Sequence, residues 1–177
     1  YSGGDYDLAG FCVGVVEKDR IIDGSRVQPG DVLLGLASSG IHSNGFSLAR
    51  KVVPENDENL WKTLLTPTRI YVKEILTLLE SGVVLGAAHI TGSGLAANIQ
   101  RALPDDLVPR LSWDWPEPEV FTRIMEAGNI PLDEMRRVFN MGIGMALVTK
   151  KADAEGLIAF GKNHGIELTV IGEAARG

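Results

Sequence analysis

Short apolar runs alternate along this chain with segments of helical periodicity, and this alternation most limits how it can fold. Each run is bounded by Gly, Pro or polar residues, which is typical of strands buried in a sheet. Such runs occupy residues 8–18, 31–37, 83–89, 108–112, 143–149 and 167–171. Because strands and helices do not alternate strictly, we predict an α/β (α+β) fold with helices layered on a mixed six-stranded sheet.

Helices are predicted where apolar residues recur at spacings of three and four and where Pro or Gly ends the pattern. The clearest segment is 69–80, in which Ile70, Ile75 and Leu79 contribute to one broad apolar face. The others are 45–53, 95–103, 116–127, 132–139 and 153–164, and the charged stretch 55–59 is predicted to be a loop. We therefore expect one domain over residues 8–177, preceded by a polar linker at residues 1–7.

The charge of the chain limits its partners. The formal net charge of −6 argues against a general binder of nucleic acid or of anionic membranes, which would need a basic face. One anionic small molecule stays compatible with it, because a local site can oppose the global charge. No signal peptide is visible, and no uncharged stretch approaches the roughly 18–20 residues of a membrane span. The lone Cys12, inside an apolar run, is predicted to be a buried small hydrophobe rather than a nucleophile.

Two predicted strand-to-helix turns contain the side chains best suited to binding a ligand. Residues 38–45 carry three serines, Asn44 and His42, and residues 89–94 combine a histidine with a Gly-rich turn. Such turns can aim backbone N–H groups at an anion, and His42 titrates near neutral pH. The alternative is a polar turn in which Ser43 or Asn44 caps the next helix. Neither a Walker sequence nor a Gly-x-Gly-x-x-Gly sequence is present.

Other conspicuous segments are interpreted as structural. The glycines of residues 140–145 indicate close packing of backbone against a helix, and residues 113–115 indicate an anchor between surface and core. His164 precedes a glycine at a predicted helix C-terminus, where the helix dipole stabilises a cation. No cluster of Cys, His or carboxylates has metal-ligand spacing, so no metal ligand is predicted.

Several segments together resemble a known family. They are 7–18, 38–48, 65–73, 89–92, 98–104, 120–121, 128–130 and 139–145. Their order and spacing resemble the C-terminal domain of the phosphoribosylformylglycinamidine cyclo-ligase family, also called aminoimidazole ribonucleotide synthetases, over residues 7–173. The segments Leu-Thr-Pro-Thr-Arg-Ile-Tyr and Phe-Asn-Met-Gly-Ile-Gly-Met are specific to that family, whereas His-Ser-Asn-Gly is shared with its wider superfamily.

The resemblance implies a cytoplasmic enzyme of purine biosynthesis. Members of the family use ATP and Mg²⁺ to phosphorylate the amide oxygen of formylglycinamidine ribonucleotide, after which a ring nitrogen attacks and phosphate leaves. The resemblance also implies an N-terminal domain before residues 1–7, which carries the ATP site and most acidic metal ligands and forms a homodimer. The active site would lie between the two domains, so this chain alone is expected to be inactive.

By the same resemblance, both turns face the cleft and contact the phosphorylated substrate. His42 is the candidate catalytic residue, acting on the reacting amide as a hydrogen-bond donor or as an acid/base group. We expect it to be exposed and neutral near the positive end of a helix. Ser93 replaces a glycine of the family's usual Thr-Gly-Gly-Gly turn. The expected substrate-binding residues are Ser39, Gly40, Ser43, Asn44, Gly45, Thr91, Gly92, Ser93 and Gly94.

Two other functions stay open. One is a related ATP-using enzyme of the superfamily, formylglycinamidine ribonucleotide synthetase. The segment 67–71 favours the cyclo-ligase over this alternative. The other is a non-catalytic binding or scaffold domain, which stays open because this sequence contains no ATP-binding half.

Overall fold

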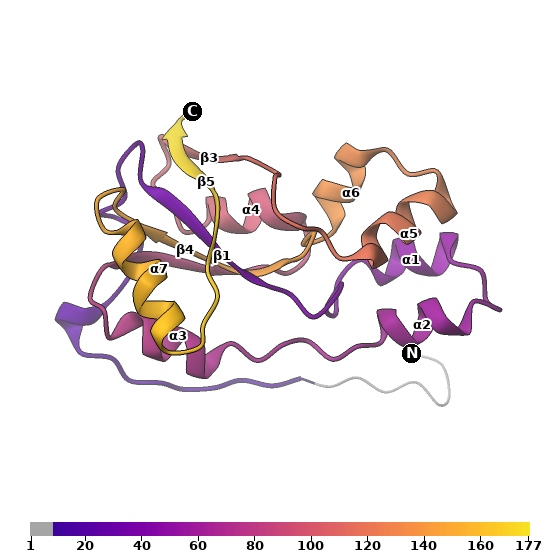
Figure 1. The fold of residues 1–177 in the computed structure, drawn as a ribbon, viewed down its shortest axis with the longest axis horizontal. Coiled ribbons are helices and arrows are strands. Elements are labelled where there is room, and N and C mark those ends of the chain that lie inside the picture. The colour runs from indigo at the N-terminus through magenta and orange to yellow at the C-terminus, as the bar shows by residue number, and fades with distance from the viewer. Residues whose placement is uncertain (1–8) are drawn as a thin grey trace.

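The computed structural model describes residues 9–177 and has one antiparallel sheet with helices around it (Figure 1). The strand order is β2-β4-β1-β5-β3. The strands are β1 (Val32–Ala37), β2 (Val84–His89), β3 (Leu107–Leu111), β4 (Ile143–Thr149) and β5 (Thr169–Arg176). The helices are α1 (Phe46–Val52), α2 (Glu58–Leu64), α3 (Val72–Leu79), α4 (Gly94–Gln100), α5 (Glu119–Gly128), α6 (Leu132–Val138) and α7 (Ala154–Asn163), with a short 3-10 helix at Lys18–Arg20.

The α/β fold class is confirmed, but the prediction of a mixed sheet is wrong. Five of the six predicted strands are present, and every pair of neighbouring strands is antiparallel. The strands β1 and β2 do run in the same direction. They do not pair with each other, because β4 lies between them and is antiparallel to both. The sheet therefore contains no parallel ladder among residues 9–177.

The sixth predicted strand, residues 8–18, is not observed as a strand. Residues 9–17 form no sheet ladder, and Phe11, Val13 and Val15 are almost fully exposed. A strand needs a neighbour to satisfy its backbone, and the described part of the chain offers none to this segment. Cys12 is exposed as well, so the prediction that it is buried is wrong. Leu8 and the predicted linker at residues 1–7 lie outside the described residues.

The helix α2 was not predicted, because its start lies in the charged stretch 55–59. Asp57 caps it by accepting a hydrogen bond from the backbone N–H of Leu60 at 3.0 Å. The same carboxylate forms an ion pair with Arg123 of α5 at 2.6 Å. Leu60 and Leu64 are buried against the neighbouring helices. Capping and packing therefore decide the helical state of a segment whose composition is typical of a loop.

The core consists of three apolar clusters, two on the sheet and one beyond it. Leu33 and Leu34 are successive residues of β1 and therefore point to opposite faces. Leu33 packs in a cluster with α4, whereas Leu34 packs with residues of α3 and α7. The third cluster joins α1, α2, α5 and α6 around Phe121 and Phe139. Figure 1 shows these four helices gathered beyond one end of the sheet.

The turn before α4 places two consecutive residues in the left-handed region. Ser93 has φ 76° and Gly94 has φ 72°. A Cβ on Gly94 would collide with the backbone carbonyl of Arg136 in α6. Ser93 is exposed, and an L-residue in this region costs roughly 1–2 kcal/mol. A glycine at this position would avoid that strain, but it would also lose more conformational entropy on folding.

We expect the two positions to respond in opposite directions. Ser93→Gly should leave the free energy of unfolding unchanged or raise it by up to about 1 kcal/mol, because the left-handed strain disappears. Gly94→Ala should lower it by more than about 2 kcal/mol, because both the backbone and α6 must shift. Urea denaturation measures both values, and a larger loss in Ser93→Gly than in Gly94→Ala would contradict this account of the turn.

Candidate functional site

Three loops meet at one end of the sheet. The strands β1 and β2 both end where β4 begins, since each is antiparallel to β4. The loops that follow β1 and β2 therefore lie beside the turn that precedes β4. The backbone N–H of Ser38 donates to the carbonyl of Gly142 at 2.8 Å, and that of Ile90 donates to Gly144 at 3.0 Å. A Cβ on Gly92 would lie 3.8 Å from Oδ1 of Asn44, so the two predicted binding turns are neighbours.

The predicted substrate-binding residues differ in how accessible they are. The exposed ones are Ser39, Ser43, Gly92 and Ser93, the half-buried ones are Asn44, Gly45 and Thr91, and the buried ones are Gly40 and Gly94. Neither Ser43 nor Asn44 caps α1, whose N-cap is Gly45 without a side-chain hydrogen bond. Helix capping therefore does not occupy these two polar side chains.

His42 is buried, which corrects the prediction that it is exposed. The residue is 2% exposed, because its ring packs beneath the turn against Tyr71 and the backbone of Gly144. Its Nε2 accepts a hydrogen bond from the backbone N–H of Ser39 at 3.2 Å, while its Nδ1 is buried without a partner. Burial lowers the pKa of His42, and the neighbouring His89 and Arg69 lower it further, so its ring is neutral at pH 7.

The segment 67–71 forms one wall of this site. The Tyr71 hydroxyl and Nη1 of Arg69 both donate to the carbonyl of Ala37, at 2.8 and 3.0 Å, and so fix the end of β1. Burial raises the pKa of Tyr71 to about 12, which keeps its hydroxyl protonated as a donor. The hydroxyl of Ser39 donates to the carbonyl of Pro67 at 2.7 Å. Sequence reasoning used this segment as a family marker and did not assign Arg69 or Tyr71 to the site.

Asn140 joins the turn before β4 to the loop after β1. Its buried Nδ2 donates to the carbonyl of Gly40 at 2.9 Å. Its Oδ1 accepts from the hydroxyl of Ser38 at 3.1 Å and from the backbone N–H of Gly142 at 2.9 Å. The sequence predicted only close backbone packing for this segment. The packing exists, but at Gly144 it is against the side chains of the site rather than against a helix.

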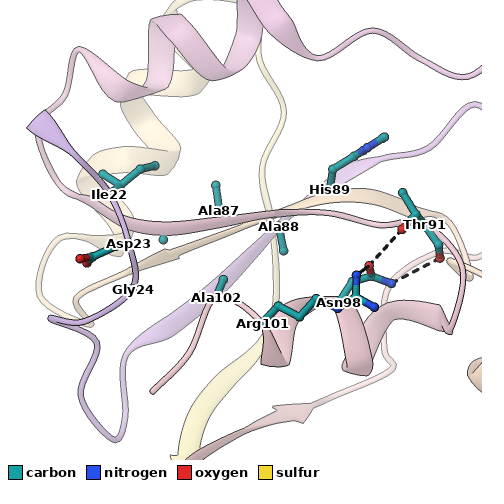
Figure 2. Close-up of a pocket in the computed structure, with 11 residues that line it drawn as sticks. Ile22, Asp23, Gly24, Ala87, Ala88, His89, Thr91, Asn98, Arg101 and Ala102 are labelled. Carbon is teal, nitrogen blue, oxygen red and sulfur yellow. Dashed lines mark hydrogen bonds between the residues drawn. The ribbon is translucent and has the colours of Figure 1, made fainter. Parts of the chain in front are cut away.

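Asn98 of α4 holds the second turn in the same way (Figure 2). Its Nδ2 lies within hydrogen-bonding distance of the carbonyls of Thr91, Gly92 and Gly94, at 3.3, 3.0 and 2.7 Å. Its Oδ1 accepts from the hydroxyl of Thr91 at 3.1 Å. Asn98 is an amide among the buried apolar residues of α4, and this is the sequence signal that could have identified it.

A hollow of about 280 Å³ lies beside this turn (Figure 2). It is lined by residues 22–24, residues 86–89, Thr91, Asn98, Arg101 and Ala102. The exposed guanidinium of Arg101 has one long contact, 3.5 Å to Oδ1 of Asn98, and no ion pair with another described residue. The carboxylate of Asp23 accepts two hydrogen bonds from Ser25. The hollow therefore contains the guanidinium of Arg101, which forms no ion pair with a described residue, together with the carboxylate of Asp23, while the hydroxyl of Thr91 is already donated to Asn98.

Residues 9–177 lack both a cluster of metal ligands and a membrane-spanning helix. No group of three or more His, Cys, Asp and Glu side chains is arranged to hold a metal ion. No helix in this range has both the length and the apolar character that crossing a membrane requires.

Comparisons with known proteins agree with this architecture. The chain is 48% identical over 190 residues to phosphoribosylformylglycinamidine cyclo-ligase of Myxococcus xanthus, covering 100% of this chain and 55% of that protein. It is 50% identical over 183 residues to the cyclo-ligase of Burkholderia lata, covering 98% and 50%. Its fold is similar to thiamine-monophosphate kinase from Stenotrophomonas maltophilia, with a TM-score of 0.61, 16% identity and coverage of 92% and 52%.

The chain spans about half the length of the curated relatives it matches. Residues 28–177 match the model of the family described as "AIR synthase related protein, C-terminal domain". That match includes the loops after β1 and β2, the segment 67–71 and the turn before β4, but not residues 22–24 of the hollow. The chain therefore belongs to the AIR synthase related protein family, in its C-terminal domain.

Proposed function

We propose that this chain is the C-terminal domain of a phosphoribosylformylglycinamidine cyclo-ligase, with residues 8–177 as the domain and residues 1–7 as a linker. The enzyme would use ATP to close the imidazole ring of aminoimidazole ribonucleotide in purine biosynthesis. The observation that carries the proposal is 48% identity to a protein of that name over the whole of this chain. The convergence of the loops after β1 and β2 at one end of the sheet supports it independently.

Each part of the site then has a proposed role. The exposed residues of the two turns, such as Ser39, Ser43 and Ser93, would contact the substrate. The hollow beside Thr91 would take an anionic group of the phosphorylated substrate, with Arg101 as its cation. His42 would act on the reacting amide, as a hydrogen-bond donor or as an acid/base group.

The remaining components of the proposed enzyme would lie outside this chain. ATP and Mg²⁺ would be bound mainly by an N-terminal domain, which would also form a homodimer, in the cytoplasm. The greater length of the relatives and the exposed apolar side chains of Phe11, Val13 and Val15 support such a neighbouring domain. Residues 9–177 contain no cluster of metal ligands, and none of them is assigned to Mg²⁺.

The function is tested on the full-length protein. We expect it to convert formylglycinamidine ribonucleotide to aminoimidazole ribonucleotide with release of one ADP per ring closed, and we expect the 177-residue chain alone to release none. The two preparations are compared in a coupled ADP assay with product detected by chromatography. Glutamine-dependent use of formylglycinamide ribonucleotide would indicate the related synthetase instead. No turnover of either substrate would favour a binding domain, and ADP release by the isolated chain would contradict the division between domains.

His42→Ala in the full-length protein should lower kcat by roughly 10²–10⁴-fold, the usual contribution of an acid/base group. Because the ring is buried, some stability should be lost too, and thermal unfolding will show whether the variant remains folded at the assay temperature. The matched control is His164→Ala, whose exposed ring contacts only the end of α7 and should leave kcat unchanged. Wild-type turnover in folded His42→Ala would remove His42 from the mechanism.

Arg101→Ala should raise the KM for formylglycinamidine ribonucleotide by about 10- to 100-fold with little change in kcat, because one charged hydrogen bond to the substrate is lost. The control is Arg110→Ala, on the strand β3 at the opposite edge of the sheet, where the guanidinium pairs with Glu173. Steady-state kinetics of both variants decide the assignment. Equal effects of the two substitutions would mean that the hollow does not hold the anionic group.

A further inference from the structure

One ring nitrogen of His42 is already engaged within its own loop. The backbone N–H of Ser39 donates a hydrogen bond to Nε2 over 3.2 Å. A backbone amide can only donate, so Nε2 must present its lone pair and cannot carry a proton. The neutral ring therefore carries its proton on Nδ1, and the backbone of the loop selects this tautomer.

The other nitrogen, Nδ1, is a buried donor without an acceptor. Buried N–H groups in native proteins are nearly always paired, so an exception needs a physical explanation. The one other unpaired buried side-chain atom among the described residues is Nε of Arg136, whose guanidinium lies 4.3 Å from the ring centre of Trp113. That aromatic face accounts for Arg136. No comparable contact accounts for His42, whose nearest aromatic rings have centres at 6.2 and 6.4 Å.

The groups around His42 favour an oxygen acceptor that arrives with a ligand. The hydroxyl of Tyr71 and the guanidinium of Arg69 are donors that already serve the carbonyl of Ala37. Arg69 also forms an ion pair with Glu74 at 3.2 Å, which leaves Nδ1 of His42 as the buried donor without a partner in this group. Ser39 and Ser43, which lie on either side of His42 in the same loop, are both exposed, so the loop that covers the buried ring is accessible to a ligand.

We propose that His42 acts through Nδ1, as the donor of a hydrogen bond to an amide or phosphoryl oxygen of the bound ligand, while Nε2 holds the turn. The identity of the ligand rests on the proposed function, whereas the tautomer does not. The proposal excludes a role for Nε2 as the base that removes a proton from the substrate, since the lone pair of Nε2 is occupied by Ser39.

The proposal gives His42 a definite task in ring closure. When the ring nitrogen forms the new C–N bond, the bond between carbon and the phosphorylated oxygen breaks, and its electron pair leaves with the phosphate. The proton displaced from the nitrogen passes to water. A hydrogen bond from Nδ1 to the departing oxygen stabilises the negative charge that develops there, and no proton needs to leave the histidine.

The first experiment observes the tautomer and its ligand by NMR. The full-length protein is labelled with ¹⁵N at histidine, and the His42 resonances are identified by their loss in His42→Asn. We expect a protonated Nδ1 and an unprotonated Nε2 without ligand at neutral pH. Formylglycinamidine ribonucleotide should shift the Nδ1 resonance. Inorganic phosphate is the second probe: a shift with both probes indicates a phosphoryl oxygen, and a shift with the nucleotide alone indicates the amide oxygen.

The second experiment separates the two nitrogens by substitution. The side-chain amide of His42→Asn falls near the position of Nδ1, whereas that of His42→Gln falls near the position of Nε2. If Nδ1 is the working atom, His42→Asn should keep at least about 10-fold more kcat than His42→Gln, the worth of one retained hydrogen bond. Circular dichroism checks that both variants are folded. If either variant is unfolded, the NMR experiment on the wild-type protein decides which ring nitrogen contacts the ligand.

An Nε2-protonated ring, an Nδ1 resonance that responds to neither probe, or a folded His42→Gln as active as His42→Asn would each overturn the proposal. Failure of the proposed function looks different. In that case the full-length protein closes no ring, while the tautomer and the response to phosphate can still be measured.

Discussion

The site depends on the backbone pairing of β4 with β1 on one side and β2 on the other. β4 is antiparallel to both, so the ends of β1 and β2 and the beginning of β4 coincide. These two ladders bring together three loops that are distant in sequence. Gly144, near the start of β4, leaves room for His42 and Tyr71, because a Cβ there would overlap both side chains. Any shift in register would separate the loops.

Buried amides then give the loops their shape. Asn140 and Asn98 each hold one turn through both of their polar atoms, and each is almost fully buried. A buried amide is costly unless its hydrogen bonds are made, and here the turns themselves supply the partners. The arrangement suits a ligand site, since turns that are held by buried amides keep residues such as Gly92 and Ser93 exposed.

The outcome at particular residues shows which signals were reliable. Runs such as 143–149 were recognised because a continuous apolar run indicates a buried strand, whether its neighbours are parallel or antiparallel. The helix α2 was missed because one capping carboxylate, Asp57, outweighs the loop-like composition around it. Residues 9–17 and Cys12 were misjudged because strand formation and burial both require a neighbour, which an apolar pattern cannot supply by itself. The amide networks involve residues up to 102 positions apart, and no local pattern reports such partners.

The sequence by itself determined the α/β class, most element positions and the resemblance to the cyclo-ligase family. It also singled out two turns whose Ser, Gly, Asn and His content suits a ligand site. The class, the element positions and the turns are local properties, visible in spacing and composition within a few residues, whereas the resemblance rests on the order of segments over residues 7–173. Only the tertiary structure decided that the sheet is antiparallel, that the turns meet, and that His42 is buried with Nε2 bound to Ser39 and Nδ1 unpaired. Those features arise from contacts between distant segments, whose geometry is set when the whole core packs.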